Sequence, residues 1–282
     1  MRQIALHQRR ELNLLARSLI IAAEFLLLLY VWNRAAAHLL PMVLPSPALT
    51  WQRLCELVSE GAVAEQLGLT LRRAFSGFVG AYLAALACGI LAHRFRWLRY
   101  ALTPWLDAMQ VVPTVVWLIL AVLWFGVAEE MTPMFVVFVV CFPVVLVQVR
   151  EALVAIPAEL RDLAALEPLG LWGYTVHVVW PSVLPALLGA ATLGFSFAWR
   201  SVIFAEFVAS NSGMGYQLSR AYHNLATEDV FAWTIVLVVL MWLWQTLVVS
   251  PFRQHDQESK GKHRISESSG VQGHVTTLRD EL

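Results

Sequence analysis

Two ionisable residues, Arg200 and Glu206, stand in a segment that is otherwise apolar from about Ser182 to Ala209. An unpaired charge in lipid costs at least about 2.5 to 3.5 kcal/mol, so both side chains must face protein or water. On an α-helix their separation corresponds to about 600° of rotation, which leaves them about 120° apart and predicts no salt bridge between them. Two interpretations stay open. One or both residues line a path for a solute, or they pair with other helices or extend to the membrane interface.

Proline and glycine mark two further places where the backbone must depart from a regular helix. Pro113 falls inside an apolar segment, where its ring and missing N–H interrupt the helical hydrogen bonds. Such a break is tolerated in a membrane only where protein or a water-filled cavity receives the freed backbone groups. After the segment that holds Arg200, the residues Asn211 to Tyr216 read NSGMGY. Gly213 and Gly215 allow φ values closed to other residues, so a tight turn is expected there.

No catalytic or metal site is predicted. The histidines stand at expected helix ends, in loops or in the tail, and no HExxH motif occurs. The three cysteines, Cys55, Cys88 and Cys141, are far apart and lack the spacing of metal ligands or of a disulfide framework. The sequence contains no GxxxxGK[ST] phosphate loop, so ATP hydrolysis and a bound cofactor are not expected in this chain. A formal net charge of zero, with no large basic patch, argues against a nucleic-acid partner.

The elements that must position these residues are membrane-spanning helices. Of the 282 residues 59% are hydrophobic and only 14% are charged, against about 25% charged in a soluble domain. The apolar residues form blocks close to the roughly 20 residues that cross a bilayer. We therefore expect an all-α, polytopic membrane protein with about six transmembrane helices, at approximately 18–40, 74–93, 108–128, 131–149, 182–209 and 230–252. A signal peptide is the alternative for the first of these, but no small-residue cleavage site follows it.

The distribution of Lys and Arg predicts the orientation. These residues accumulate on cytoplasmic loops, and most of the 20 in this chain fall on one side if both termini are cytoplasmic. Residues 1–17 are then a cytoplasmic N-terminus, and residues 18–250 form the membrane domain with a cytoplasmic loop at 150–180. Residues 251–282 are polar and lack apolar periodicity, so they are expected to form a disordered cytoplasmic tail.

Four segments occur in the order that one transporter family shows. They read TLRRAFSGFVGAYLAALACGI from Thr70, VVPTVVWLILAVLWFG from Val111, DLAALEPLGLWGYTVHVVWPSVLP from Asp162 and AWRSVIFAEFVASNSGMGYQLSRA from Ala198. Together they resemble the permeases of binding-protein-dependent ABC importers, in the nitrate/sulfonate/taurine branch. The segment from Asp162 resembles the cytoplasmic EAA-type loop of that family, with Pro168 at the family's glycine position and Gly170 two residues later.

This resemblance implies a non-catalytic subunit of a bacterial cytoplasmic (inner) membrane importer, a type I ABC importer permease-like bundle. The implied partners are a cytoplasmic ABC ATPase dimer, a second permease copy in a homodimer or heterodimer, and an extracytoplasmic solute-binding protein. The implied solute is a small organic or inorganic anion such as a sulfonate, taurine or nitrate. The resemblance also places the NSGMGY turn near the mouth of the translocation path. The candidate path residues are then Pro113, Arg200, Glu206, Asn211, Gly213 and Gly215.

The cytoplasmic loop predicts a short coupling helix at about 157–170. Proline at its start and acidic residues in its first turns match the preferences of a helix N-terminus. Its small apolar face could dock in a groove of a partner protein, and an ordinary amphipathic interfacial helix is the alternative. The candidate coupling residues are Glu159, Asp162, Leu163, Ala164, Ala165, Leu166 and Gly170. A secondary transporter or channel is the alternative function, but it should show inverted repeats and midplane ion sites.

Overall fold

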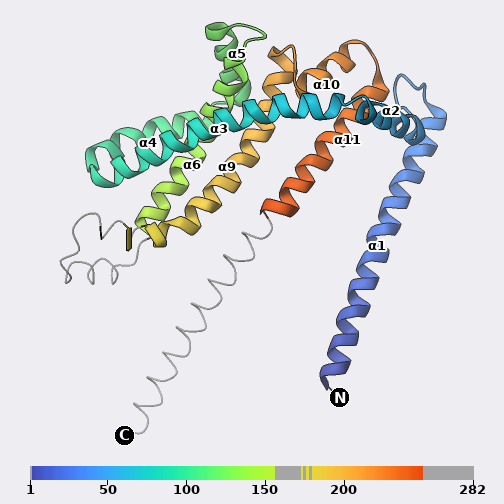
Figure 1. Ribbon diagram of the computed structural model, residues 1–282, viewed down its shortest axis with the longest axis horizontal. Helices are drawn as coiled ribbons and strands as arrows, with labels where there is room; N and C mark the ends of the chain where they lie inside the picture. The colour runs from blue at the N-terminus through green and yellow to red at the C-terminus, as the bar shows by residue number, and fades with distance from the viewer. Residues whose placement is uncertain (1, 156–172, 174–175, 178–179, 250–282) are drawn as a thin grey trace. The chain divides into compact units, whose positions relative to one another are not determined.

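Every regular element in the described part of the chain is helical. The computed structural model describes residues 2–155, 173, 176–177 and 180–249, with side chains described from residue 19 onward. The helices are α1 (Arg2–His38), α2 (Pro47–Ser59), α3 (Ala62–Arg94), α4 (Arg96–Val111), α5 (Thr114–Phe125), α6 (Met131–Val154), α9 (Trp180–Ala209), α10 (Met214–His223), α11 (Thr227–Trp244) and the π-helix η2 (Gln245–Val249) (Figure 1). Within these residues five helices are long and apolar enough to cross a membrane, or six if one bent pair counts as a span. The prediction of an all-α fold with about six transmembrane helices is confirmed.

The chain divides into two compact units. The first contains Met1–Ala64 and Gln217–Val236, and the second contains Glu65–Tyr216 and Leu237–Leu282. In the first unit the indole N–H of Trp32 donates a hydrogen bond to the Pro45 carbonyl at 3.0 Å, and its ring stacks on Phe231 with centroids 5.6 Å apart. Arg53 forms ion pairs with Glu56 and Asp229. These contacts tie α1, α2 and the start of α11 together.

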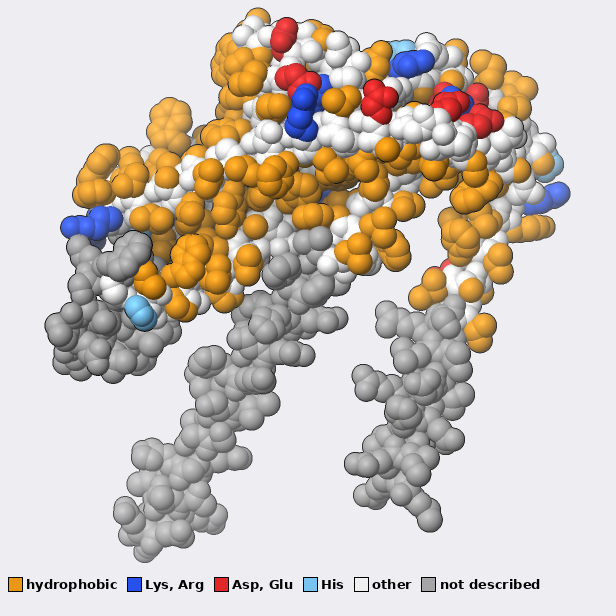
Figure 2. All heavy atoms as spheres, in the orientation of Figure 1, with side chains coloured by type: hydrophobic (Ala, Val, Ile, Leu, Met, Phe, Trp, Pro, Cys, Tyr) orange, Lys and Arg blue, Asp and Glu red, His pale blue; other side chains and the backbone are white. Residues whose placement is uncertain are grey.

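The apolar stretch of α1 is mostly exposed within the described chain, apart from the contacts of Trp32. None of the residues in its span, Leu19–His38, is buried. Figure 2 shows that apolar side chains also cover most of the visible surface of the long helices, with few charged side chains among them. A soluble protein rarely exposes an apolar patch larger than a few hundred Å², so this surface is suited to lipid.

The second unit is built on the pair α6 and α9, which pack along each other, with α3 against both (Figure 1). The face of α3 that packs inward consists of small residues, and Ala74, Ala81 and Ala85 are completely buried. A Cβ added at Gly77 would lie 2.6 Å from the Met134 carbonyl oxygen of α6. Small residues at helical spacing let two membrane helices approach closely, because only backbone separates them.

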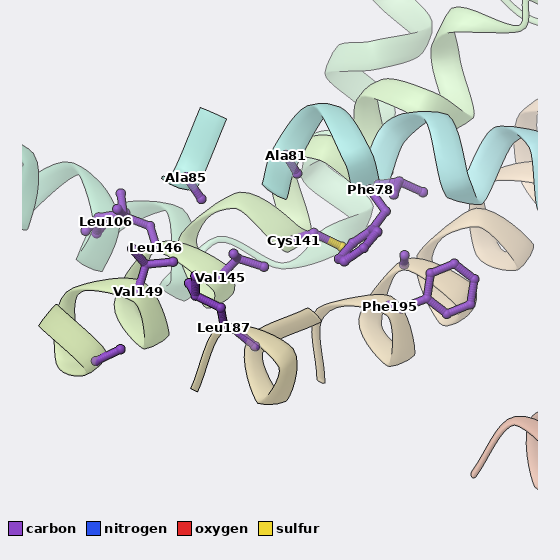
Figure 3. Close-up of a cluster of buried hydrophobic side chains, with 14 of the residues drawn as sticks. Phe78, Ala81, Ala85, Leu106, Cys141, Val145, Leu146, Val149, Leu187 and Phe195 are labelled. Carbon is purple, nitrogen blue, oxygen red and sulfur yellow. The ribbon is translucent and has the colours of Figure 1, made fainter. Parts of the chain in front are cut away.

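Aromatic rings fill the space that these small residues leave between α3, α6 and α9. Phe78 of α3 meets Phe195 of α9 edge to face, with ring centroids 5.6 Å apart. Figure 3 shows Phe78 reaching toward Cys141 of α6, with Val145 beside it. The Cys141 thiol is buried and donates to the Gly194 carbonyl at 3.4 Å. Close packing of this kind makes α3, α6 and α9 the rigid part of the unit.

One span is broken. The axes of α4 and α5 differ by 98° across a break at Val112 and Pro113. Val112 has an extended ψ of 122°, as expected for a residue before proline, and Pro113 begins the next helix with φ of −59°. The stretch 108–128, which the sequence predicts as one span, therefore holds the end of α4, the break and α5. The sequence argument that Pro113 interrupts a helix agrees with this geometry.

Candidate functional site: a cavity at the helix break and a buried charge network

A cavity of about 680 Å³ lies beside the break between α4 and α5. The end of α4, the break and the start of α5 form one wall, and α6 and α9 form the others. The lining residues are Met109, Gln110, Val112, Pro113, Thr114, Val115, Trp117, Val140, Pro143, Val144, Phe197, Arg200, Ser201 and Phe204. A concave, mostly apolar space with a few polar groups is the usual form of a small-solute site. The break between α4 and α5 therefore lies in the wall of a space of this form.

Arg200 supplies the charge of this cavity. It is exposed on α9, and it has no hydrogen bond or ion pair to the part of the chain that the structure describes. No acidic residue belongs to the described wall of the cavity. The guanidinium is always charged and presents a planar set of donors that matches carboxylate, sulfonate or phosphate oxygens. This cavity can therefore receive an anionic group.

Glu206, one and a half turns further along α9, has a different environment. Its side chain is completely buried, and Arg73 of α3 donates to one carboxylate oxygen at 2.9 Å. The Thr70 hydroxyl and the Gly215 N–H donate to the other oxygen at 2.8 and 3.1 Å. A buried carboxylate is tolerated only when it is paired and hydrogen-bonded, and both conditions are met here.

The same network holds the turn at residues 210–215 in place. Arg73 donates to the Ser212 carbonyl and hydroxyl oxygens, both at 2.7 Å. The Gly213 N–H donates to the Gln66 side chain at 2.7 Å. Gly213 has φ of +97°, and a Cβ there would collide with the Glu206 carboxylate. Glycine is required at this position both by the backbone conformation and by the close approach of the carboxylate.

Glu130 completes the charge balance of the network. It accepts hydrogen bonds from Arg73 and Arg72, each at 2.7 Å, so two arginines face two carboxylates. Glu130 lies just before α6, and its side chain is half-exposed. The hydrogen bond from Arg73, together with the nearby positive charges, holds the pKa of the Glu130 carboxyl below its usual value. The carboxylate is thus ionised at neutral pH and neutralises the second arginine.

A second cavity, of about 450 Å³, lies between the ends of α3 and α6 and the start of α4. Its charged or titratable lining residues are His93, Arg99, Arg150 and Glu151, and Ala155 closes it. Ala155 directly precedes the segment 156–172, which holds all the candidate coupling residues and lies outside the described residues. In the described part of the chain, no group of three or more His, Cys, Asp or Glu side chains is placed to hold a metal ion.

The structure separates the candidate path residues into two groups. Pro113 and Arg200 line the 680 Å³ cavity together. Glu206, Gly213 and Gly215 belong instead to the buried network with Arg73. Asn211 is exposed in the turn between α9 and α10. The predicted absence of a salt bridge between Arg200 and Glu206 agrees with these positions, and Glu206 follows the alternative in which it pairs with another helix.

The sequence argument missed Arg73 and its partners Thr70, Gln66 and Ser212. It placed Arg73 at the polar edge of a span beginning at residue 74, whereas α3 begins at Ala62. The sequence does contain a pattern that indicates the burial of Arg73. Thr70 and Arg73 continue the helical spacing of Gly77 and Ala81, which form the buried face of α3. A polar pair that continues a small-residue stripe indicates burial, not solvent exposure.

Residues 77–257 match the family described as "Binding-protein-dependent transport system inner membrane component". The chain is 32% identical over 214 residues to the riboflavin transport system permease protein RibX of Chloroflexus aurantiacus, covering 73% of this chain and 80% of that protein. It is 25% identical over 235 residues to the taurine transport system permease protein TauC of Escherichia coli, covering 80% and 84%. Its fold is similar to a chain of the MetNI methionine ABC transporter in an inward-facing conformation, with a TM-score of 0.59 and 17% identity, covering 68% of this chain and 95% of that chain.

These similarities agree with the helical fold, the apolar surfaces and the order of the segments that resemble the nitrate/sulfonate/taurine branch. The family match covers the α4–α5 pair, α6, α9 and the turn after α9, whereas Thr70 and Arg73 lie just before its first residue. The chain therefore belongs to the family of binding-protein-dependent transport system inner membrane components, and it is a permease subunit of an ABC importer.

Proposed function

We propose that this permease forms the membrane path for a small anion, together with a second permease copy, and that a separate ATPase drives it. The main support for this proposal is the 680 Å³ cavity at the break between α4 and α5, whose lining is mostly apolar and includes one arginine. Taurine, named in one relative, carries a sulfonate group, which supports an anionic solute. Riboflavin, which appears in the name of another relative, is uncharged. Uptake assays must therefore compare an anion with riboflavin.

In this proposal Pro113 and Arg200 line the path, and the buried network holds its frame. Pro113 keeps α4 and α5 apart, so that the space beside α9 stays open. Glu206, Gly213 and Gly215 fix the turn after α9 against α3. Asn211 is exposed beside this turn, and a contact between Asn211 and the solute stays a prediction.

Energy transfer is assigned to the cytoplasmic loop and to partner proteins. The candidate coupling helix at about 157–170 docks on one subunit of an ABC ATPase dimer, and a solute-binding protein delivers the anion on the other side of the membrane. Support comes from the family, whose description names both binding-protein dependence and the inner membrane. ATP-driven closure of the partner would move this helix and rock the spans between inward-open and outward-open states. No observation favours the alternative of a secondary transporter or channel.

The test is transport by the reconstituted importer. Liposomes that contain this chain, its ATPase and its binding protein should take up a small anion such as taurine, a sulfonate or nitrate only when ATP is present. Omission of either partner should abolish uptake. Uptake by this chain alone, down a gradient and without nucleotide, would contradict the proposed mechanism.

A single substitution tests the coupling helix in the same system. Ala164→Arg places a charged side chain on the small apolar face that is proposed to dock, so co-purification of the ATPase and ATP-dependent uptake should both fall at least tenfold. Arg161→Ala, in the same segment but outside the set of coupling residues, is the matched control and should retain both. Undiminished ATPase association in Ala164→Arg would remove the docking assignment.

A further inference from the structure

Within the long span α9, Arg200 is a charged side chain whose partner the described chain does not supply. Arg72 and Arg73 are paired with Glu130 and Glu206. Arg150 reaches the Thr103 hydroxyl at 3.4 Å. Arg200 instead faces the cavity, whose described wall contains no carboxylate. The group that balances this charge must therefore come from outside the described chain.

The position of Arg200 along α9 makes this imbalance costly in lipid. Nine residues separate it from the end of the helix at Ala209, which corresponds to about 14 Å, roughly half the thickness of the hydrocarbon core. The carboxylate nearest along the helix, Glu206, points about 120° away and is already saturated by Arg73, Thr70 and Gly215. A guanidinium at such a depth is retained where it lines a water-filled path or binds a ligand.

We propose that Arg200 is the anion-binding residue of the transport path, and that its guanidinium holds the sulfonate, carboxylate or comparable oxyanion group of the solute in the cavity beside the α4–α5 break. This inference rests on the proposed function and names the residue that selects the charge of the solute.

The remainder of the wall is suited to this role. Gln110, Thr114 and Ser201 offer amide and hydroxyl groups to the oxyanion or to the uncharged part of the solute. Trp117 and Phe204 lie among the apolar lining residues and keep the site poor in polar groups. In such surroundings the attraction between the guanidinium and an anion is stronger than in bulk water.

A lipid phosphate group has oxygens like those of a solute oxyanion, so it is the alternative partner of the Arg200 guanidinium. Trp117 of α5 and Phe197 and Phe204 of α9 line the same cavity as Arg200, and its volume of about 680 Å³ favours a small solute over a headgroup that remains attached to its acyl chains. The experiments below separate the two sources by varying solute and lipid independently.

The first experiment measures the electrostatic potential at the site and needs no knowledge of the solute. Phe204→Cys lies one turn from Arg200 and is introduced with Cys55→Ser, which removes the exposed native thiol. In proteoliposomes at low ionic strength, the Phe204→Cys thiol is reacted with a negatively charged reagent, sulfonatoethyl thiosulfonate, and with a positively charged one, trimethylammonioethyl thiosulfonate. We expect Arg200→Gln to lower the ratio of the first rate to the second about tenfold, because the positive charge of the guanidinium attracts the negative reagent. Arg200→Lys should keep most of the ratio. Asn211→Cys, an exposed thiol about 16 Å away, is the matched control and should not respond.

The second experiment is uptake by the complete importer, with the loaded binding protein at saturating concentration. Arg200→Gln should lower anion uptake at least about fivefold, and Arg200→Lys should restore part of it. Uptake should fall more than ATP hydrolysis, so that fewer anions enter for each ATP hydrolysed. A merely structural role would instead lower uptake and hydrolysis together and would contradict the inference.

The outcomes distinguish the inference from the proposed function. If the wild-type importer takes up an anion and Arg200→Gln takes it up equally fast, Arg200 is not the binding residue, although the proposed function stands. If the wild type takes up only uncharged solutes such as riboflavin, both fail. If Arg200→Gln slows uptake in anionic liposomes but not in liposomes of phosphatidylcholine alone, the headgroup of an anionic lipid is the partner, and the inference is overturned.

Discussion

At the scale of single residues, two adjacent arginines show that the contribution of an ion pair to stability depends on its burial. Arg72 and Arg73 both bind Glu130, but the Arg72 side chain is 58% exposed and the Arg73 side chain only 2%. An exposed ion pair contributes about 0 to 1 kcal/mol, because water and salt screen it. Removing one partner of a buried pair costs about 3 to 5 kcal/mol, because the other charge is left uncompensated. The network around Glu206 therefore depends on Arg73 and hardly on Arg72.

Arg73→Gln and Glu206→Gln are each expected to destabilise the protein by about 3 to 5 kcal/mol, whereas the double variant loses less than the sum of the two. Arg72→Gln, the neighbouring control, should cost less than about 1 kcal/mol. Thermal unfolding of the purified permease in detergent measures all four variants. Strictly additive losses would show that Arg73 and Glu206 do not act as a pair.

Glu130 is expected to make stability depend on pH. Its pKa is lower in the folded protein than in the unfolded chain, chiefly because Arg73 donates a hydrogen bond to it. The resulting stabilisation is fully present above the unfolded pKa of about 4.3 and is lost as the pH falls through the folded pKa. The difference in unfolding temperature between wild type and Glu130→Gln should therefore be positive at pH 7 and shrink toward zero below about pH 4. A difference that is constant over this range would contradict the ion pair.

At the scale of elements, the close approach of α3 to α6 rests on glycine. Gly77 faces backbone of α6 that cannot rotate away, whereas Gly68, on the same helix, has nothing within 4 Å of an added Cβ. The two positions form a matched pair, because alanine favours the helix equally at both.

Gly77→Ala is expected to destabilise the protein by about 1 to 3 kcal/mol, since α3 must move away from the Met134 carbonyl and disturb the core around Phe78. Gly68→Ala should be neutral, or stabilising by up to about 1 kcal/mol. Unfolding temperatures of the two variants in the same detergent test this difference. Equal effects of the two substitutions would mean that α3 and α6 are not close enough to exclude a Cβ at Gly77.

The helices themselves were largely predictable, because each depends on local composition. Uncharged blocks indicated the spans, and Pro113 indicated a break, since a proline ring forbids helical geometry at the preceding residue whatever the fold. The true start of α3 at Ala62 was missed. Its first turns carry Glu65, Gln66 and Arg73. Polar residues of this kind are interpreted as a loop unless the partners of Gln66 and Arg73 on α9 and in the turn after it are known.

At the scale of the whole molecule, membrane orientation follows from the distribution of charge along the chain. The prediction of cytoplasmic termini can be tested with the native thiol of Cys55, which is exposed on α2 and is predicted to face outward. A membrane-impermeant maleimide should label Cys55 in right-side-out vesicles, whereas a Ser268→Cys thiol in the tail, added with Cys55→Ser, should react only in inverted vesicles. The reverse pattern would overturn the orientation and move the coupling loop to the external face.

By itself the sequence determined the class of the protein: an all-α membrane permease, with a proline break and two charged residues on different faces of the fifth span. These properties follow from hydrophobicity, helix length and backbone chemistry, which act within a few turns of the chain. Only the tertiary structure decided what Arg200 and Glu206 do. Glu206 is surrounded by residues more than a hundred positions away on α3, and Arg200 lines a cavity whose other walls come from α4, α5 and α6. Glu206 is buried and paired with Arg73, so it stabilises the packing of α9 against α3. Arg200 lines a cavity whose described wall has no carboxylate, so its guanidinium is available to an anion.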